Sequence, residues 1–177
     1  NANDKVINLS DKNIGSADLE LLSVWITHSG RGFAQPVSAM VHTLKLANNP
    51  LAGSGGSELD GFDALCATVN EIKSWDLAGC KAMNAQVTTS LVKTIDWNQC
   101  EIQDLKLDSS GIPNNAKPYT LNAEGAMNFS GKNLGYVDTL LITKWISRKN
   151  MAKRVTQMLL AGNPALVGEV DQLGSLM

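Results

Sequence analysis

Two stretches of the chain, 120 residues apart, carry the same order of apolar and polar positions. Residues 4–27 align without a gap to residues 124–147, and nine of the aligned positions are identical. Each stretch opens with a short alternating run that is typical of a strand. A turn rich in Asn and Gly follows, and then apolar residues recur at i, i+4 and i+8, which predicts one face of a helix. We interpret four of the identical residues as structural anchors of a repeat: Gly15, Gly135, Trp25 and Trp145. Trp25 and Trp145 are expected to occupy equivalent buried positions.

A looser likeness continues beyond these stretches. Residues 37–41 match 155–159, and an Asn-Pro pair then ends each pattern. Pro interrupts regular structure because it lacks a backbone donor. The sequence therefore predicts a strand–turn–helix–helix unit that occurs twice, as unit A over 4–53 and as unit B within 100–168.

The chain between the units predicts a helical insert over 58–99. An alternating strand is expected at 100–107, a longer strand at 119–130, and a closing helix at 165–177. We expect residues 3–177 to form a single compact α+β domain, in which the duplicated units pack on a small, mostly antiparallel sheet.

Composition restricts the classes of function. Charged residues make up 18% of the chain, against about 25% in typical globular proteins. The net charge of −2 argues against nucleic-acid binding. The sequence contains no run of about 18 apolar residues, so we do not expect it to span a membrane. Asn1-Ala2 is typical of a cloning scar, and the surface is rich in Asn, Ser and Thr. We therefore expect a leader or anchor upstream in the gene and an extracytoplasmic location (periplasmic, envelope or secreted).

No motif predicts a metal or a cofactor. The three cysteines, Cys66, Cys80 and Cys100, do not form a Cys-x-x-Cys pair, and His28 and His42 are isolated. Buried free thiols, with Cys66 foremost, and one disulfide plus one thiol remain alternative states of these cysteines. The acidic residues do not have the spacing of a calcium loop.

Catalysis has weak support. His28-Ser29 suggests a hydrolase, but the Gly-x-Ser-x-Gly elbow is missing, and unit B has Arg148-Lys149 at the matching place. The glycine-rich segments 29–32 and 53–56 lack the spacing of phosphate loops. We therefore expect a protein that is not an enzyme.

Two groups of cations are candidate partner contacts. The repeated turn motif places Lys12 and Lys132 at matching positions, and a basic segment contains Lys144, Arg148 and Lys149. These residues suit a protein partner, self-association or an anionic lipid surface. The alternative is that the turns and the tryptophans only maintain the fold.

The first hypothesis for function is a non-enzymatic binding or assembly domain of a larger envelope or secreted protein. The second is a small-ligand or lipid-binding module with an apolar cavity between helices and sheet. The third is a hydrolase.

Overall fold

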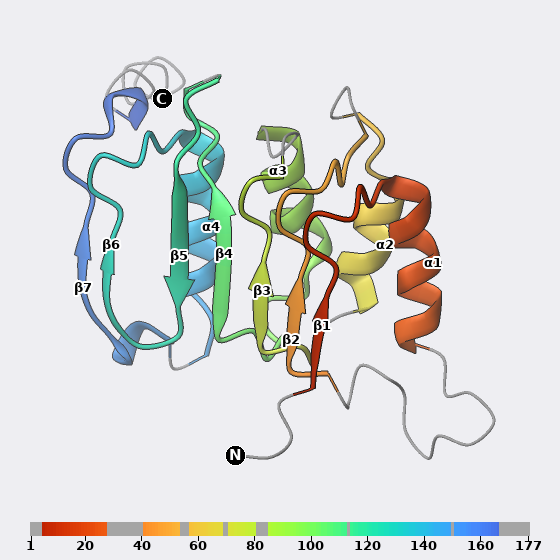
Figure 1. Cartoon of the computed structure of the whole chain (residues 1–177). Helices are drawn as coiled ribbons and strands as arrows, with labels where there is room; N and C mark the ends of the chain where they lie inside the picture. Colours follow the sequence, from red (N-terminus) through yellow and green to blue (C-terminus); the bar gives the residue numbers. More distant parts are fainter. Residues whose placement is uncertain are drawn as a thin grey trace.

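The computed structural model describes residues 5–27, 41–53, 57–68, 71–80, 85–112, 114–149 and 151–166. Within them, short strands and helices alternate along the chain (Figure 1). The strands are β1 (Val6–Asn8), β2 (Thr43–Lys45), β3 (Ser74–Asp76), β4 (Asp104–Asp108), β5 (Pro118–Asn122), β6 (Gly125–Asn128) and β7 (Val155–Leu159). The helices are α1 (Ser16–Thr27), α2 (Asp60–Thr68), α3 (Ala85–Thr94), α4 (Tyr136–Ile146) and the short 3-10 helix η2 (Met151–Lys153).

The strands form a five-stranded sheet in the order β1-β2-β3-β4-β5 and a two-stranded sheet of β6 and β7. Strands β1 to β4 are parallel, β5 is antiparallel to β4, and β6 is parallel to β7. In Figure 1, α3 and α4 lie behind the strands, α1 and α2 lie to the right of β1, and no described α-helix lies in front of the sheet. The prediction of a mixed α and β fold holds, but the prediction of a mostly antiparallel sheet is wrong. A helix that follows a strand carries the chain back, so that the next strand runs in the same direction.

Three other predictions also need correction. Residues 155–159, expected to be a second helix, form β7, and β3 lies inside the supposed helical insert. The long strand expected at 119–130 is divided into β5 and β6 by a bend at 123–124. The matching second helix at 37–41 lies outside the described residues except for Val41. Of the closing helix, only 165 and 166 are described, and both are helical.

The two long stretches share their backbone conformation. The predicted helices at 16–27 and 136–147 are confirmed as α1 and α4. Asn13 and Asn133 both adopt a left-handed conformation, with φ of 58° and 60°, which asparagine tolerates better than most residues. The Asp18 carboxylate accepts a hydrogen bond from the Gly15 N–H at 3.0 Å, and Asp138 accepts the same bond from Gly135 at 2.8 Å. The same local bonds therefore start both helices.

The core lies between the sheet and the helices. One rung of matched residues crosses the five-stranded sheet with its side chains buried: Leu44, Trp75, Leu105 and Leu121, with half-buried Ile7 at the edge. On the helix side, α1 and α2 pack so closely that a Cβ on Gly61 would collide with the Ser16 carbonyl oxygen. This close approach lets the Gly61 N–H donate a hydrogen bond to the Ser16 hydroxyl oxygen at 3.0 Å.

Candidate functional site

A pattern of eleven residues covers three of the strands and the turns that follow them. Its form is apolar-x-x-apolar-x-apolar-x-x-Asn/Cys-x-apolar, and the last position is Leu or Ala. It occurs at 41–51, 72–82 and 155–165. In the first of these, Val41, Leu44 and Leu46 are all buried. In the first two occurrences the apolar positions therefore face the core and the x positions between them face the uncovered side of the sheet, whereas Leu160 of the third occurrence is 43% exposed.

The ninth position of the pattern connects neighbouring strands. Asn49 donates from its amide to the Leu9 carbonyl at 2.8 Å, and the Cys80 thiol donates to the Leu46 carbonyl at 3.3 Å. Asn163 donates to the Phe129 carbonyl at 2.9 Å. In each case the acceptor follows the preceding strand, so that one buried polar side chain joins two successive strand–turn segments.

Burial fixes the protonation state of the cysteine in this series. It raises the pKa of the Cys80 thiol to about 11, against 9.0 for a free thiol, because the charged form loses its hydration. The thiol therefore stays protonated at neutral pH and remains a donor. Cys66, Cys80 and Cys100 are all free thiols, and the expected burial holds for Cys66.

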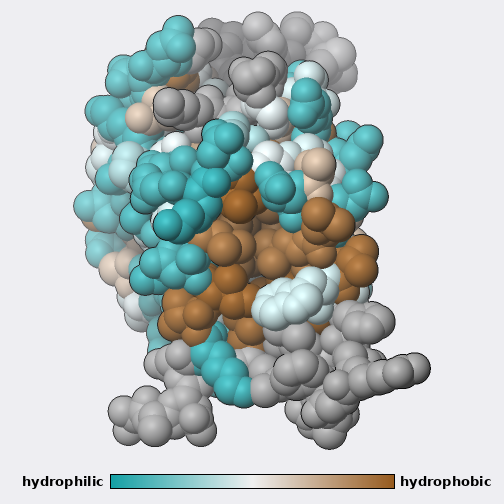
Figure 2. All heavy atoms as spheres, turned by 45° about the vertical axis from the view of Figure 1, so that its right-hand side comes forward, coloured by the Kyte–Doolittle hydropathy of each residue, from teal (hydrophilic) through white to brown (hydrophobic). Residues whose placement is uncertain are grey.

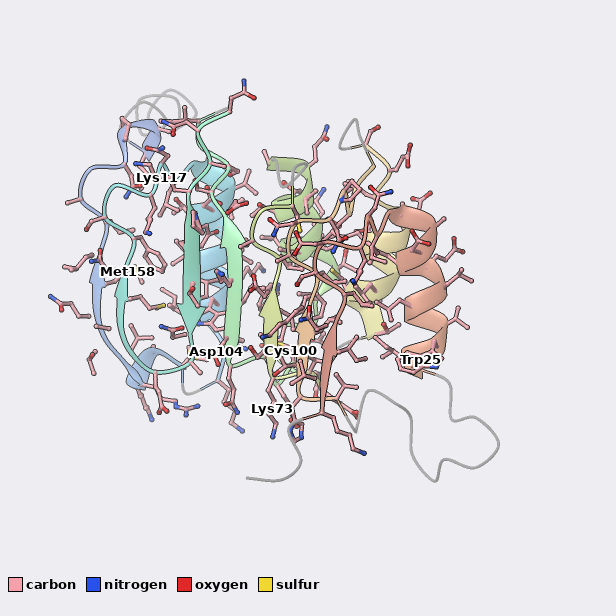
Figure 3. All side chains as sticks on the ribbon, in the orientation of Figure 1. Trp25, Lys73, Cys100, Asp104, Lys117 and Met158 are labelled. Carbon is pink, nitrogen blue, oxygen red and sulfur yellow. The ribbon has the colours of Figure 1, made fainter. Side chains whose placement is uncertain are left out.

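The uncovered face of the sheet, which we call the open face, carries two rows of mostly polar side chains. Strand register aligns them across five strands. The first row is Val6, Thr43, Ser74, Asp104 and Asn122, and the second is Asn8, Lys45, Asp76, Lys106 and Thr120. None of these ten side chains is buried. Figure 3 shows the side chains along the sheet, with Asp104 labelled at the start of β4.

Charges alternate along the second row. Lys45 and Lys106 flank Asp76 on the adjacent strands. The Lys106 ammonium lies 3.4 Å from the Asp76 carboxylate, in an exposed pair that contributes little to stability. At the start of the strands, the backbones of Lys5, His42, Lys73 and Gln103 are connected by hydrogen bonds. The open face therefore offers cations, carboxylates and amides at a spacing that the strands hold fixed at roughly 4.8 Å.

The cations predicted as partner contacts occupy several places. Lys12 and Lys132 follow β1 and β6, which belong to different sheets, and Lys144 and Lys149 are exposed on and just after α4. Arg148 is 7% exposed. Its guanidinium carbon lies 3.8 Å from the Trp145 ring centroid, and Nη1 donates to the Ile102 carbonyl at 2.6 Å. Arg148 therefore holds α4 against the segment before β4 and is not a surface contact.

The tryptophans expected to occupy equivalent buried positions differ. Trp145 is fully buried; its indole N–H donates to the Asn122 carbonyl at 3.0 Å, and its ring meets Trp97 edge-on at 6.2 Å. Trp25 is 53% exposed. The prediction that Trp25 is a buried anchor is therefore wrong, although its helix forms as expected.

A buried carboxylate lies near Trp145 on α4. Asp138 accepts hydrogen bonds from the Gly135 and Ser110 N–H groups, both at 2.8 Å, and from the hydroxyls of Ser110 and Tyr119. Burial raises the pKa of Asp138, while these four donors favour the charged form. Asp138 and Tyr119 are buried and Ser110 is partly buried, and the cluster binds α4 to the loop after β4.

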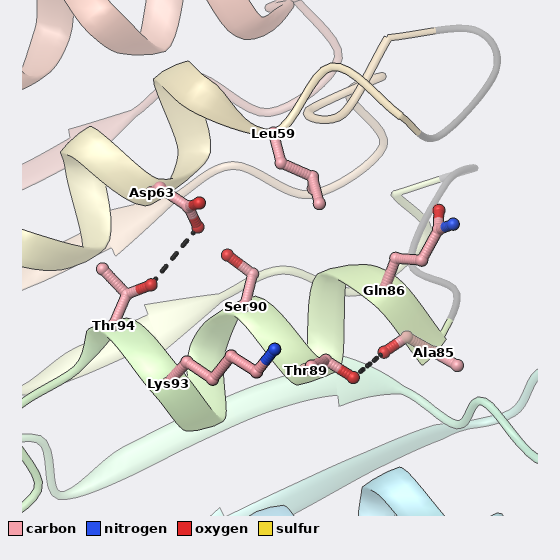
Figure 4. A pocket seen from close by; sticks show the side chains of 8 residues that line it. All are labelled: Leu59, Asp63, Ala85, Gln86, Thr89, Ser90, Lys93 and Thr94. Carbon is pink, nitrogen blue, oxygen red and sulfur yellow. Dashed lines mark hydrogen bonds between the residues drawn. The ribbon is translucent and has the colours of Figure 1, made fainter.

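Figure 4 shows a groove of about 360 Å³ between α2 and α3. Six of its eight lining residues are polar, and the Thr94 hydroxyl crosses it to the Asp63 carboxylate at 3.3 Å. The groove is open to solvent and is therefore not the enclosed apolar cavity of the second hypothesis. The suggested hydrolase pair, His28-Ser29, lies outside the described residues. Among the described residues, no cluster of three His, Cys, Asp or Glu side chains is suited to a metal ion.

In the described part of the chain, no helix has the length and apolarity required to cross a bilayer. No family model, curated protein or solved structure matches the chain. The geometry of the chain is therefore the basis for a functional proposal.

Proposed function

We propose that the chain is a solenoid of strand–turn–helix repeats of the leucine-rich kind, and that it binds a protein partner through the open face. The short pattern has the form Leu-x-x-Leu-x-Leu-x-x-Asn/Cys-x-Leu, which is typical of such repeats. The recurring bonds from Asn49, Cys80 and Asn163 support a repeated unit. On this proposal the two long stretches are two occurrences of that unit, and β5 is a departure from it.

The observation that carries the binding role is the alignment of polar side chains on the open face. Stacked repeats bury their apolar positions between neighbours and present the remaining strand positions as one extended surface. The row Lys45, Asp76 and Lys106 combines charges of both signs. Such a surface fits a polar protein surface of matching charge better than a single-sign polyanion.

The ten described side chains that form the two rows of the open face do not combine into an arrangement that favours catalysis. The two rows contain neither His nor Cys, and the Lys106–Asp76 pair is exposed to solvent. Nucleophilic catalysis needs a base within hydrogen-bond reach of a nucleophile. We therefore propose a binding domain, acting in an extracytoplasmic protein as the composition suggests.

Charge reversal tests the location of the binding surface. A partner is first isolated by crosslinking from the native source and its affinity for the purified chain is measured. Lys45→Glu with Lys106→Glu should weaken that affinity at least roughly tenfold, because two charges of the surface change sign. The matched control is Lys144→Glu with Lys149→Glu, which changes the same number of exposed charges near α4 and should leave the affinity unchanged. Loss of binding in the control alone would place the interface on the basic segment and overturn the proposal.

A further inference from the structure

The same three residues are exposed on α1 and buried on α4. Asp18, Leu21 and Trp25 match Asp138, Leu141 and Trp145 in sequence. The α4 residues are fully buried, whereas Leu21 is 71% exposed and Trp25 53%. The two helices share these three residues and their starting bonds, but each packs a different face against its neighbours: α1 buries Leu19, Ser23 and Ile26.

On α4 the cover comes from the segments that precede β6. Trp97 packs against the Trp145 ring, Asn122 accepts its indole N–H, and Ser110 donates to Asp138. The described residues supply no such cover for α1. Figure 2 shows apolar side chains gathered on the side of the molecule where α1 lies. We call the exposed residues Leu21, Val24 and Trp25 the α1 face.

A fourth pair of matching residues also differs between α1 and α4. Val24 on α1 is 59% exposed, and the matching residue on α4 is Lys144, which is also exposed. At this exposed position α4 therefore has a charged residue, Lys144, whereas α1 has an apolar residue, Val24. The seven residues from Leu21 to Thr27 include no charge. Depletion of charge around an aromatic residue is typical of the centre of a protein interface.

The strand next to α1 is also open at its outer edge. In the five-stranded sheet β1 pairs only with β2. The backbone groups of Lys5, Leu9 and Asp11 bond towards β2 and the turn after it. Since successive residues of a strand direct their backbone groups to opposite sides, those of Val6 and Asn8 face outward. An unpaired edge of this kind can take another strand.

We propose that the α1 face and the β1 edge together form a two-fold interface with a second copy of this chain. A two-fold axis perpendicular to the sheet sets β1 antiparallel to its counterpart and keeps both α1 helices on the same side. The α1 face then meets its own copy, so that each Leu21 and Trp25 gains an apolar, uncharged partner. A face that is self-complementary in this way satisfies the requirement of a two-fold dimer.

The exposed side chains of the α1 face supply part of the area of a dimer interface, and the β1 edge would have to supply the rest. A specific interface needs about 800 Å² per partner. The 12 residues of α1 span about 18 Å, and the β1 edge extends the contact across the sheet. Trp25 alone exposes roughly 100 Å². The two sheets would form one ten-stranded sheet, but this proposal does not depend on the binding role of the open face.

Sedimentation analysis of the purified chain tests the interface, from about 1 to about 500 μM. We expect a monomer–dimer equilibrium in the wild type. Val24→Lys combined with Leu21→Gln should weaken dimerisation at least roughly tenfold. Lysine at the matching position of α4 shows that the helix accepts it. The control is Leu160→Gln, which alters a 43% exposed residue after β7 and should leave dimerisation unchanged.

Tryptophan fluorescence gives an independent measurement. Trp75, Trp97 and Trp145 are buried, so Trp25 should account for the quenching by acrylamide in the monomer. Its quenching should fall as the dimer forms. A wild type that stays monomeric at about 500 μM would overturn the proposal. So would association into open-ended polymers, or a dimer that the double variant does not weaken.

Discussion

The hydrogen bonds of Asn49 provide a direct test of the repeat interpretation. Its amide donates to the carbonyls of Leu9 and Leu46, both at 2.8 Å, and its carbonyl accepts from the N–H groups of Lys12 and Ile14 at 3.0 and 2.9 Å. Asn49 is itself fully buried. A single side chain thus joins β1, the turn after it and β2, and no apolar residue can replace these bonds.

Asn49→Ala should lower the free energy of unfolding by about 3–4 kcal/mol. Leaving a buried polar group without a partner costs about 1–3 kcal/mol. The Leu9 carbonyl and the N–H groups of Lys12 and Ile14 lose the Asn49 side chain, with water reaching some of them at the partly buried turn, while the Leu46 carbonyl keeps the Cys80 thiol. For a domain of this size the midpoint of thermal unfolding should fall by roughly 6–12 °C. Asn49→Asp should cost at least as much, because an ionised carboxylate cannot donate to the two carbonyls.

The neighbouring Asn48 offers a matched control. It is exposed and adopts a left-handed conformation with φ of 60°. Asn48→Gly preserves that backbone and should change the stability by less than about 0.5 kcal/mol. Urea and thermal unfolding of the three variants would compare them. If Asn49→Ala were within about 1 kcal/mol of Asn48→Gly, the side-chain bonds between strands would not support the stack as reasoned here.

Two further predictions concern buried side chains. Trp145→Ala should cost about 3–5 kcal/mol in denaturant unfolding, while Trp25→Ala in dilute monomer should cost less than about 1 kcal/mol; equal losses would contradict the difference in burial. The folded pKa of Cys80, about 11, lies above its unfolded value, so the thiol contributes stability that is present below pH 9 and is lost as pH rises through about 11. Cys80→Asn, which introduces the residue found at Asn49 and Asn163, should fold and lose stability less steeply than wild type between pH 9 and 11. An identical slope in both proteins would refute this assignment.

Local structure was predictable where a residue's neighbours in sequence determine it. The turns with Asn13 and Asn133 and the helices after them form as the pattern indicates, because turn chemistry and helix starts depend on a few adjacent residues. Strand direction was not predictable in this way. The run Val155–Leu159 was taken for a helix because it resembled 37–41, although its length and its β-branched residues suit a strand.

The open face was missed for a different reason. The identity between 4–27 and 124–147 predicts a repeat with a period of 120 residues, whereas the shorter pattern at 41–51 and 72–82 recurs after 31 residues. A search for a repeat of about 30 residues would have found it. The pattern would also have predicted parallel strands, and hence that Lys45 and Asp76 lie side by side. The charges of Lys45 and Asp76 alone do not indicate that the two residues lie side by side.

The exposure of Trp25 could not be predicted from a local sequence pattern. In a stack of repeats each unit contacts mainly its neighbours, so that a residue's burial depends on its unit's position in the stack. Trp145 has segments before it that pack on its ring, and among the described residues Trp25 has none. Sequence identity predicted the same helix twice and, by the same reasoning, the same burial twice. The second inference is wrong because the burial of a side chain depends on the segments that pack beside its helix, and these differ between α1 and α4.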